Sequence, residues 1–454
     1  MPNSPTSSAS AFSGPNSDLG KGEAAGLLIT NIAELTPLDE FGPGPQRGGL
    51  KHLKAIRNAA IHVVQGRIRD FGPAERVMAG LPKGAAPRVL DAFGGAVIPG
   101  FVDCHTHLLY SGSRADEYPM RVAGASYSEI SSSGGGVTRT IRESTDATSS
   151  ELKQALTARL EKALLNGTTT AEIKTGYWVA PEGECAALDI IAEVSASQPI
   201  DLVQTFHVAL GTPARFGGSG EYARYVIDHL LPSVASHARF CDVVCDVGAF
   251  SHDEARQILQ AAGRRGLNFK IHADEFSAAG GAELAAELGA VSADHLCFLG
   301  KDTAQTLARA QTVAVLLPAT FHYLLAPRFA DARQLIDSGV PIALGTDHGP
   351  GSPTLSMPFV MGLACSWLRM DPAEALVAAT WNAACAIRGA STAGQIAIGR
   401  PADLVVLEAP TYRDLPYLID QNLVRYTLKD GAVFGKHINY QLQQRGIKWP
   451  CCCL

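Results

Sequence analysis

The sequence predicts an α/β fold: a (β/α)8 barrel with a small β-sandwich domain built from the N- and C-terminal segments. Three observations lead to this prediction. The chain has 454 residues, which suffice for a barrel of about 250 residues and a smaller companion. Its middle part alternates short apolar runs with longer helical stretches, as in βα units around a parallel sheet. Its two ends instead carry short β patterns bounded by Gly and Pro.

The two ends of the chain predict a disordered segment and a composite sheet. Residues 1–24 are rich in Ser, Pro and Gly and offer little to bury, so we expect them to be disordered. Strands are expected at 27–32, 60–64, 66–68, 394–396, 402–407, 424–428 and 431–434. Because chain ends can lie close together, the two sets can form one sandwich from residues 25–98 and 390–440, followed by a tail at 441–454.

The barrel is expected between residues 99 and 389. Its strand candidates are 100–105, 169–175, 202–207, 242–246, 268–273, 291–295, 313–317 and 342–347. Helical stretches separate them, for example 151–166, 184–195, 221–236, 253–265 and 279–288. Eight βα units can close into a barrel, and catalytic groups in that architecture lie at the C-terminal ends of the strands.

Composition and charge exclude several classes of protein. Hydrophobic residues make up 46% and charged residues 18% of the chain, which is too apolar for a disordered protein. The net charge of −6 leaves no basic surplus for phosphate contacts, so nucleic acid is not an expected partner. No apolar run approaches the length of about 18 residues that a membrane span needs, and no signal-peptide pattern opens the chain. We therefore expect a soluble cytoplasmic protein with no membrane partner.

The cysteines are expected to be reduced. Seven of the ten lie scattered through apolar segments, without the close pairs of zinc ribbons or secreted disulfide frameworks. They are Cys104, Cys185, Cys241, Cys245, Cys297, Cys365 and Cys385. The other three, Cys451 to Cys453 before a terminal Leu, have the shape of a prenylation signal. The middle residues are not aliphatic and no polybasic run precedes them, so a frayed tail or a weak soft-metal contact is favoured.

Polar side chains gather where the predicted barrel strands end. His105 and His107 lie two residues apart on strand one, so both imidazoles can point to one spot at the barrel mouth. His272, His295 and Asp347 end strands five, six and eight. A lone histidine is more often a core residue, but chance would seldom place all of these groups at C-terminal strand ends. The three His and one Asp of strands one, five and eight suit Zn(II) or Fe(II) with room for water, and we predict such a metal site.

These residues resemble a known family. The run Asp103-X-His105-X-His107, followed by His272, His295 and Asp347, resembles the amidohydrolase superfamily of metal-dependent barrel hydrolases. Within it, residues 55 to 435 are similar to the imidazolonepropionases. The segments that carry this similarity are 112–117, 124–130, 134–136, 172–177 and 272–275.

The resemblance implies an activity and a set of roles. The activity is hydrolysis of a cyclic amide C–N bond, from 4-imidazolone-5-propanoate and water to N-formimidoyl-L-glutamate in histidine degradation. The implied ligands of the metal are His105, His107, His272 and Asp347, and the residues implied to hold the substrate are Arg114, Tyr177 and Glu275. We expect Asp347 to take a proton from the nucleophile and His295 to polarise the carbonyl. Which of Asp347, His295 and Glu275 protonates the leaving nitrogen is left open.

The three substrate residues also have interpretations that need no family. A guanidinium such as that of Arg114 suits a substrate carboxylate, although a solvated loop charge is the plain alternative. Tyr177 can donate a phenolic hydrogen bond or can be an ordinary half-buried tyrosine. Glu275 can lie beside a ring nitrogen, or it can cap the next helix. The expected partner is thus a small molecule with a carboxylate arm.

One lysine bears on the number of metal ions. Some superfamily members bridge two metals through a carboxylated lysine on strand four. Lys174 lies on strand two by our count, so we expect one divalent metal per chain, Zn(II) or Fe(II). The oligomeric state stays open, with a homodimer as the candidate assembly.

The sequence departs from the family pattern at two places near the substrate. Leu210 stands where the family has a substrate-contacting His, and His207 is a candidate replacement. After Asp347, Gly349 stands where the family has Asn, next to His348. The alternatives are therefore a related ring such as a hydantoin-like propanoate, a cyclic amidine deaminase, or a catalytically silent barrel that serves as a binding module.

Overall fold

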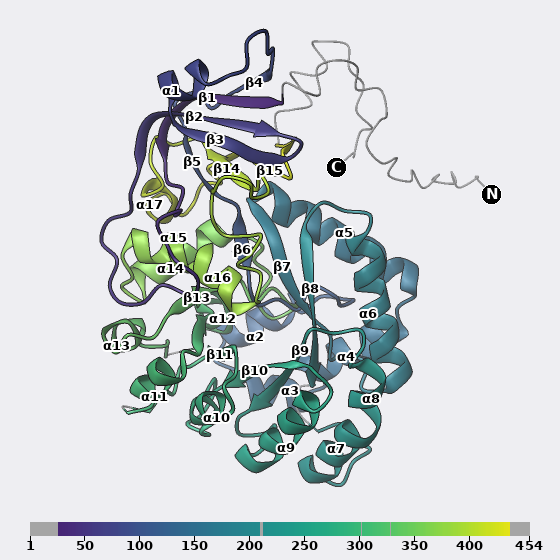
Figure 1. Ribbon diagram of the computed structural model, residues 1–454. Coiled ribbons are helices and arrows are strands. Elements are labelled where there is room, and N and C mark those ends of the chain that lie inside the picture. Colours follow the sequence, from purple (N-terminus) through teal and green to yellow (C-terminus); the bar gives the residue numbers. More distant parts are fainter. Residues whose placement is uncertain (1–25, 209–211, 301, 327, 436–454) are drawn as a thin grey trace, which may run out of the picture.

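The computed structural model describes residues 26–208, 212–300, 302–326 and 328–435, which form two eight-stranded sheets with surrounding helices (Figure 1). The predicted disorder of residues 1–24, the departure at Leu210, and the tail with Cys451 to Cys453 fall outside these residues. Among the described residues, no helix has both the length and the apolar character that a membrane span requires.

The first sheet is the predicted barrel. Its strands are β6 (Phe101–Asp103), β7 (Thr168–Lys174), β8 (Asp201–Val208), β9 (Phe240–Cys245), β10 (Asn268–Ala273), β11 (Ser292–His295), β12 (Val313–Leu316) and β13 (Ile342–Leu344). They lie in chain order and each pairs in parallel with the next. The circle closes where the amide of Asp347 donates to the carbonyl of His105 at 2.9 Å and the amide of His107 donates to that of His348 at 2.7 Å. The predicted (β/α)8 barrel is confirmed.

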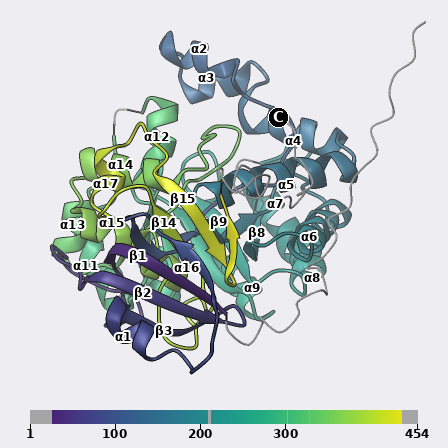
Figure 2. The same cartoon turned by 90° about the horizontal axis from the view of Figure 1, so that it is seen from above.

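Helices cover the outside of the barrel (Figures 1 and 2). They are α2 (Glu117–Val122), α3 (Tyr127–Ser132), α4 (Gly136–Asp146), α5 (Ser149–Leu165), α6 (Pro181–Ser195), α7 (Ser219–Tyr225), the π-helix η1 (Val226–Leu230), α8 (Leu231–Val234), α9 (His252–Gly263), α10 (Gly281–Leu288), α11 (Thr303–Ala310), α12 (Pro318–Leu324), α13 (Ala332–Asp337), α14 (Met357–Ser366), α15 (Pro372–Ala378) and α16 (Trp381–Ala386). Two further helices, α1 (Ala74–Ala79) and α17 (Asp414–Tyr417), lie in the terminal segments.

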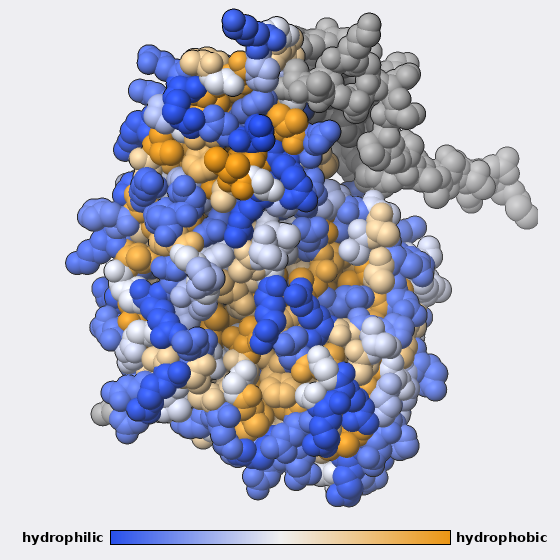
Figure 3. Space-filling view, viewed as in Figure 1, coloured by the Kyte–Doolittle hydropathy of each residue, from blue (hydrophilic) through white to orange (hydrophobic). Residues whose placement is uncertain are grey.

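Local sequence explains where several of these helices begin. The side chain of Thr148 accepts the amide hydrogen of Glu151 at the start of α5, and Glu151 accepts the amide hydrogen of Thr148 in return. Ser251 and Glu254 form the same capping box at the start of α9. In the space-filling view, hydrophilic residues cover the outer edge of the molecule and hydrophobic residues gather toward the middle of the face (Figure 3). The helices bury an apolar side, as α5 does with Leu152, Leu156 and Leu160, and leave a polar side to water.

The second sheet joins both ends of the described chain, as predicted. Its strands are β1 (Leu27–Leu35), β2 (Ile56–Val64), β3 (Arg67–Pro73), β4 (Arg88–Asp91), β5 (Ala96–Pro99), β14 (Leu404–Leu407), β15 (Val424–Lys429) and β16 (Ala432–Phe434). The order is β16-β15-β14-β5-β1-β2-β3, with β4 also paired to β1. Side chains from β1, β2, β5, β14 and β15 enclose a core of their own. The domain boundaries given above stay a prediction.

One expected strand of this sheet is wrong. Residues 394–396 form no strand because their hydrogen bonds go to the loop that follows β1. The amide of Ile396 donates to the carbonyl of Pro37 at 2.9 Å, and Nε2 of Gln395 donates to that of Leu38 at 2.8 Å. Gly394 has φ +82°, and a Cβ at this position would lie 2.8 Å from the carbonyl oxygen of Thr380, which leaves no room for a side chain. Residues 394–396 therefore connect the end of the barrel domain to the loop that follows β1.

The two sheets are also joined directly. β5 passes into β6 through Gly100, whose amide donates to the carbonyl of Asp403, just before β14, at 2.9 Å. The hydroxyl of Thr427 on β15 donates to the carbonyl of Leu164 at the end of α5 at 2.6 Å. All seven cysteines outside the tail are free, as expected, and four of them are buried.

Candidate metal and substrate site

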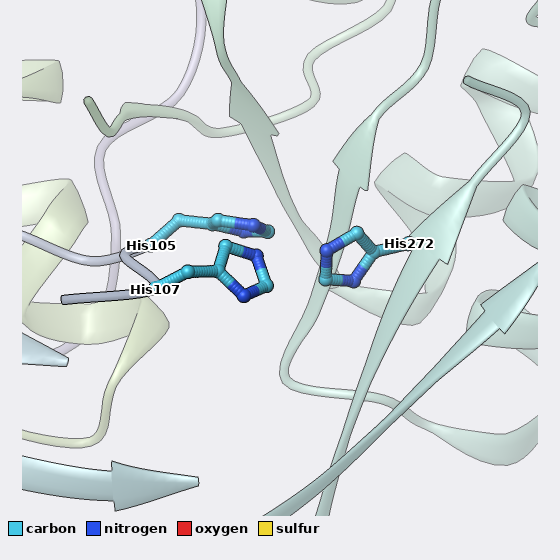
Figure 4. A group of neighbouring side chains, drawn as sticks. All are labelled: His105, His107 and His272. Carbon is cyan, nitrogen blue, oxygen red and sulfur yellow. The ribbon is translucent and has the colours of Figure 1, made fainter. Parts of the chain in front are cut away.

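Three histidine rings face one another at the barrel mouth (Figure 4). His105 and His107 follow β6, and His272 comes from the end of β10, with ligand atoms of the three within 4.8 Å of one another. The carboxylate of Asp347, after β13, completes the group. Its Oδ1 lies 3.4 Å from Nε2 of His105 and 3.5 Å from Nε2 of His107. The structure thus brings together the four residues that the sequence singled out as metal ligands.

Two of these rings are oriented by buried carboxylates. Oδ2 of Asp294 lies 2.5 Å from Nδ1 of His105, and Oδ1 of Asp242 lies 3.0 Å from Nδ1 of His272. A carboxylate beside Nδ1 accepts its proton and leaves Nε2 as the nitrogen with a free electron pair. Within the described chain, the buried Nε2 of His105 has no hydrogen-bond partner.

This donor set fits a divalent transition metal. Burial holds the pKa of His105 and that of His107 well below the usual value for histidine, so both imidazoles are neutral, as metal binding requires. Burial also raises the pKa of Asp347 to about 6, and the hydroxyl of Thr320 donates to its Oδ2 at 2.6 Å. The other carboxylate oxygen, Oδ1, is the one beside the histidines. An orphaned ring nitrogen, neutral histidines and a directed carboxylate are the features that suit a metal ion here.

His295 and Glu275 lie beside the four candidate metal ligands. His295 ends β11 with φ +80°, and both of its ring nitrogens are buried without a hydrogen-bond partner among the described residues. Oε2 of Glu275 lies 3.6 Å from Nε2 of His295. Burial raises the pKa of Glu275 well above its usual value, which favours a carboxyl group that carries a proton.

Glu275 is not a helix cap, because its neighbour Asp274 fills that role. Oδ1 of Asp274 accepts the amide hydrogens of Ala279 and Gly280 at 2.9 Å and that of Gly281 at 3.2 Å. Its Oδ2 accepts that of Ala282 at 3.0 Å. The carboxylate therefore secures the start of α10 and the loop before it. Glu275 instead lines the cavity, and its contact with a substrate stays a prediction.

The predicted substrate residues line one cavity together with His107, His272 and Asp347, three of the four candidate metal ligands. Its empty volume is about 760 Å³, including the part that is open to solvent. Its lining includes Arg114, Tyr177, His207, Glu275, His272, His295 and Asp347. Arg114 is half-buried, and its Nε is buried with no hydrogen-bond partner in the described residues. A Cβ on Gly351 would lie 2.5 Å from Nη2 of Arg114, so the glycine is what lets the guanidinium lie here.

The structure separates the two histidines that could replace the missing substrate contact. His348 turns away from the cavity, with Nδ1 2.9 Å from the carbonyl of Thr354 and Nε2 3.3 Å from the hydroxyl of Tyr110. His207 ends β8 and lines the cavity, and its ring centroid lies 4.6 Å from that of His272. His207 is therefore the candidate that has access to a ligand.

Sequence reasoning missed the groups beneath the site. Asp242 and Asp294 orient the histidines, and Glu184 accepts amide hydrogens from Gly176, Trp178 and Val179 around Tyr177. A signal existed in the sequence. Asp242 lies within an otherwise apolar strand, and Asp294 directly precedes a predicted site histidine; a charged side chain at either position needs a buried partner.

Comparisons with known proteins agree on one family. The Amidohydrolase family matches residues 96–434. The imidazolonepropionase of Symbiobacterium thermophilum is 42% identical over 413 residues, covering 90% of this chain and 96% of its own. That of Halobacterium salinarum is 43% identical over 401 residues, covering 87% and 95%. That of Geobacillus kaustophilus is 42% identical and covers 90% and 97%.

Solved structures share the fold at lower identity. A zinc-bound adenosine deaminase from Xanthomonas campestris has a TM-score of 0.68 at 18% identity, covering 90% of this chain and 93% of its own. The guanine deaminase of E. coli has a TM-score of 0.65 at 16% identity, covering 90% and 98%. At this identity the likeness concerns the fold alone.

The role of Asp274 can be tested by hydrogen exchange. In Asp274→Asn the side chain offers one acceptor oxygen and no charge, so the amides of residues 279–282 should exchange about tenfold faster or more, since hydrogen bonds to charged groups contribute about 1.5–3 kcal/mol. Mass spectrometry of the exchanged peptides measures this. Asp302→Asn is the matched control, because Asp302 precedes α11 without a capping bond from its side chain. Unchanged exchange at 279–282 would refute the role.

Proposed function

The chain belongs to the amidohydrolase family and, within it, to the imidazolonepropionases, and from this premise we propose that it hydrolyses 4-imidazolone-5-propanoate to N-formimidoyl-L-glutamate in histidine degradation. In this reaction the ring bond between the carbonyl carbon and its nitrogen breaks. The oxygen of water joins the carbon, and a proton joins the nitrogen. The observation that carries the proposal is that Arg114 lines the same cavity as His107, His272 and Asp347, three members of a candidate donor set that His105 completes.

We propose that this donor set holds one divalent ion, Zn(II) or Fe(II). A bound ion of this kind lowers the pKa of water toward neutrality and polarises a carbonyl group. His105 and His272 present Nε2 because Asp294 and Asp242 hold their Nδ1 atoms. The protein thus fixes the direction of its ligands before any ion binds.

Asp347 is suited to accept a proton in the reaction, and His295 is suited to donate a hydrogen bond. Oδ1 of Asp347 faces the ligand histidines, so it is placed to take the proton of the attacking water. His295 offers unpaired ring nitrogens to the same cavity, which suits it to donate a hydrogen bond to the carbonyl oxygen as negative charge develops there. Glu275, with its raised pKa, is suited to donate a hydrogen bond to a ring nitrogen.

The other lining residues suit the substrate's shape. The guanidinium of Arg114 is placed to pair with the propanoate carboxylate. Tyr177, on the loop whose amides donate hydrogen bonds to Glu184, also lines the cavity, and the ring centroid of His207 lies 4.6 Å from that of His272. Gly349 leaves its part of the wall without a polar side chain. We infer that His207 supplies a polar contact to the substrate from another part of the cavity wall.

Metal content tests the donor set. The purified chain should carry one equivalent of Zn(II) or Fe(II), and the double variant His105→Ala/His107→Ala should carry none. Elemental analysis after dialysis measures this. His237→Ala, an exposed histidine far from the cavity, is the control and should keep one equivalent. A metal content that survives in the double variant would contradict the assignment.

Turnover tests the catalytic roles. Asp347→Asn should lose activity by several orders of magnitude, because an amide cannot accept the proton. His295→Ala should lose about 100-fold or more in kcat, as expected for removal of an oxyanion donor. His237→Ala again serves as the control. Near-native turnover in His295→Ala would remove that residue from the mechanism.

Substrate choice tests the role of Arg114. Loss of a charge pair should cost about 2–5 kcal/mol, so Arg114→Ala should raise KM for 4-imidazolone-5-propanoate by a factor of about 30 or more. Arg142→Ala, an exposed arginine of α4, should leave KM unchanged. The assay compares 4-imidazolone-5-propanoate with hydantoin-5-propanoate and neutral hydantoin. Preference for hydantoin-5-propanoate would favour the related ring, and preference for neutral hydantoin would contradict the role of Arg114.

A further inference from the structure

A second group of possible metal ligands lies beside the first. Ligand atoms of His207, Asp242 and His272 lie within 4.8 Å of one another, and all three residues are buried. Nδ1 of His207 has no hydrogen-bond partner in the part of the chain that the structure describes, and it lies 3.8 Å from Oδ2 of Asp242. The arrangement has the donors for a second cation, next to a centre that we propose to hold one.

A lysine already occupies this second group. Nζ of Lys174 lies 2.6 Å from Oδ2 of Asp242, the same oxygen that faces His207. It also lies 2.9 Å from Oε2 and 3.0 Å from Oε1 of Glu172. The side chains of Lys174, Asp242 and Glu172 are all inaccessible to solvent. The ammonium group of Lys174 therefore offsets part of the buried negative charge of Asp242 and Glu172.

We propose that Lys174 acts as a resident cation that keeps the metal centre mononuclear, by occupying the Asp242 oxygen that a second divalent ion would need. This inference rests on the proposed single-metal hydrolase. A divalent ion bound to His207 and Asp242 would lie within a few ångströms of the buried ammonium, where water does not screen the repulsion. Burial opposes the lysine's charge, but Asp242 and Glu172 raise the pKa of Lys174 above its usual value, so the charge persists.

The same contact leaves His207 to other uses. With Oδ2 of Asp242 bound to Lys174, Nδ1 of His207 has no hydrogen-bond partner among the described residues. Because His207 lines the cavity, its imidazole can contact a substrate. One lysine thus decides whether His207 serves as a metal ligand or as a substrate contact.

A pair of charge-balanced variants tests the proposal. Lys174→Met/Glu172→Gln removes the cation from Asp242 and one negative charge together, so the net charge of the buried cluster does not change. With Zn(II) in excess, equilibrium dialysis and elemental analysis should find one equivalent in the unaltered chain and two in this variant. Adding His207→Ala should return the count to one. Circular dichroism checks that each variant is folded.

Lys270→Met/Glu172→Gln is the matched control. It makes the same change of charge on the side of Asp294, where the described residues offer no comparable second group of ligands. It should bind one equivalent. One equivalent in folded Lys174→Met/Glu172→Gln, or two in the Lys270 control, would overturn the role of Lys174.

The unaltered chain decides the matter even where a variant does not fold. A second equivalent that the unaltered chain binds and His207→Ala loses would overturn the inference and leave the hydrolase proposal in place. No bound metal in the unaltered chain would instead overturn the proposed function. One equivalent in both the unaltered chain and His207→Ala, under excess Zn(II), supports the exclusion.

Discussion

Five buried charges beneath the barrel mouth set the geometry on which the site depends. Lys174 and Lys270 lie among Glu172, Asp242 and Asp294, and none of the five side chains is accessible to solvent. Removing these charges from water is costly, and the cost is offset only when each has close partners of opposite charge. Glu172 touches both lysines, with Oε1 3.0 Å from Nζ of Lys174 and 3.4 Å from that of Lys270. It also accepts the hydroxyl of Thr205 at 2.5 Å.

The buried charges also fix the orientation of two candidate metal ligands, His272 and His105. Lys174 forms an ion pair with Asp242, which in turn contacts Nδ1 of His272. On the other side, Asp294 lies near Lys270 and contacts Nδ1 of His105. Burial opposes the negative charge on Asp242, yet His272 and Lys174 hold its pKa well below the usual value. The carboxylate therefore stays an acceptor, and the ring beside it keeps one orientation. A preorganised ligand binds a metal without losing side-chain entropy at that step.

The backbone at the mouth is as constrained as the charges below it. Asp274, His295 and Asp347 follow or end three different strands, and all three have left-handed φ angles, of +51°, +80° and +49°. Residues other than glycine seldom adopt this conformation, and they cluster at functional sites. Here it turns the chain sharply at the strand ends, so that one residue can cap a helix while its neighbour faces the cavity. Asp274 and Glu275 divide the two tasks in this way.

The sequence by itself determined the barrel, the composite sheet and the gathering of His105, His107, His272 and Asp347 at the strand ends, because each depends on a local pattern: strand and helix periodicity, a His pair two residues apart, polar groups at strand ends. It did not determine which of His207 and His348 reaches the cavity, that Asp274 rather than Glu275 caps α10, or that residues 394–396 dock to a loop. Those outcomes depend on partners far apart in the chain, such as Lys174 with Asp242 or Gln395 with Leu38. Only the tertiary structure decides them, since a buried polar group adopts whatever orientation satisfies its hydrogen bonds.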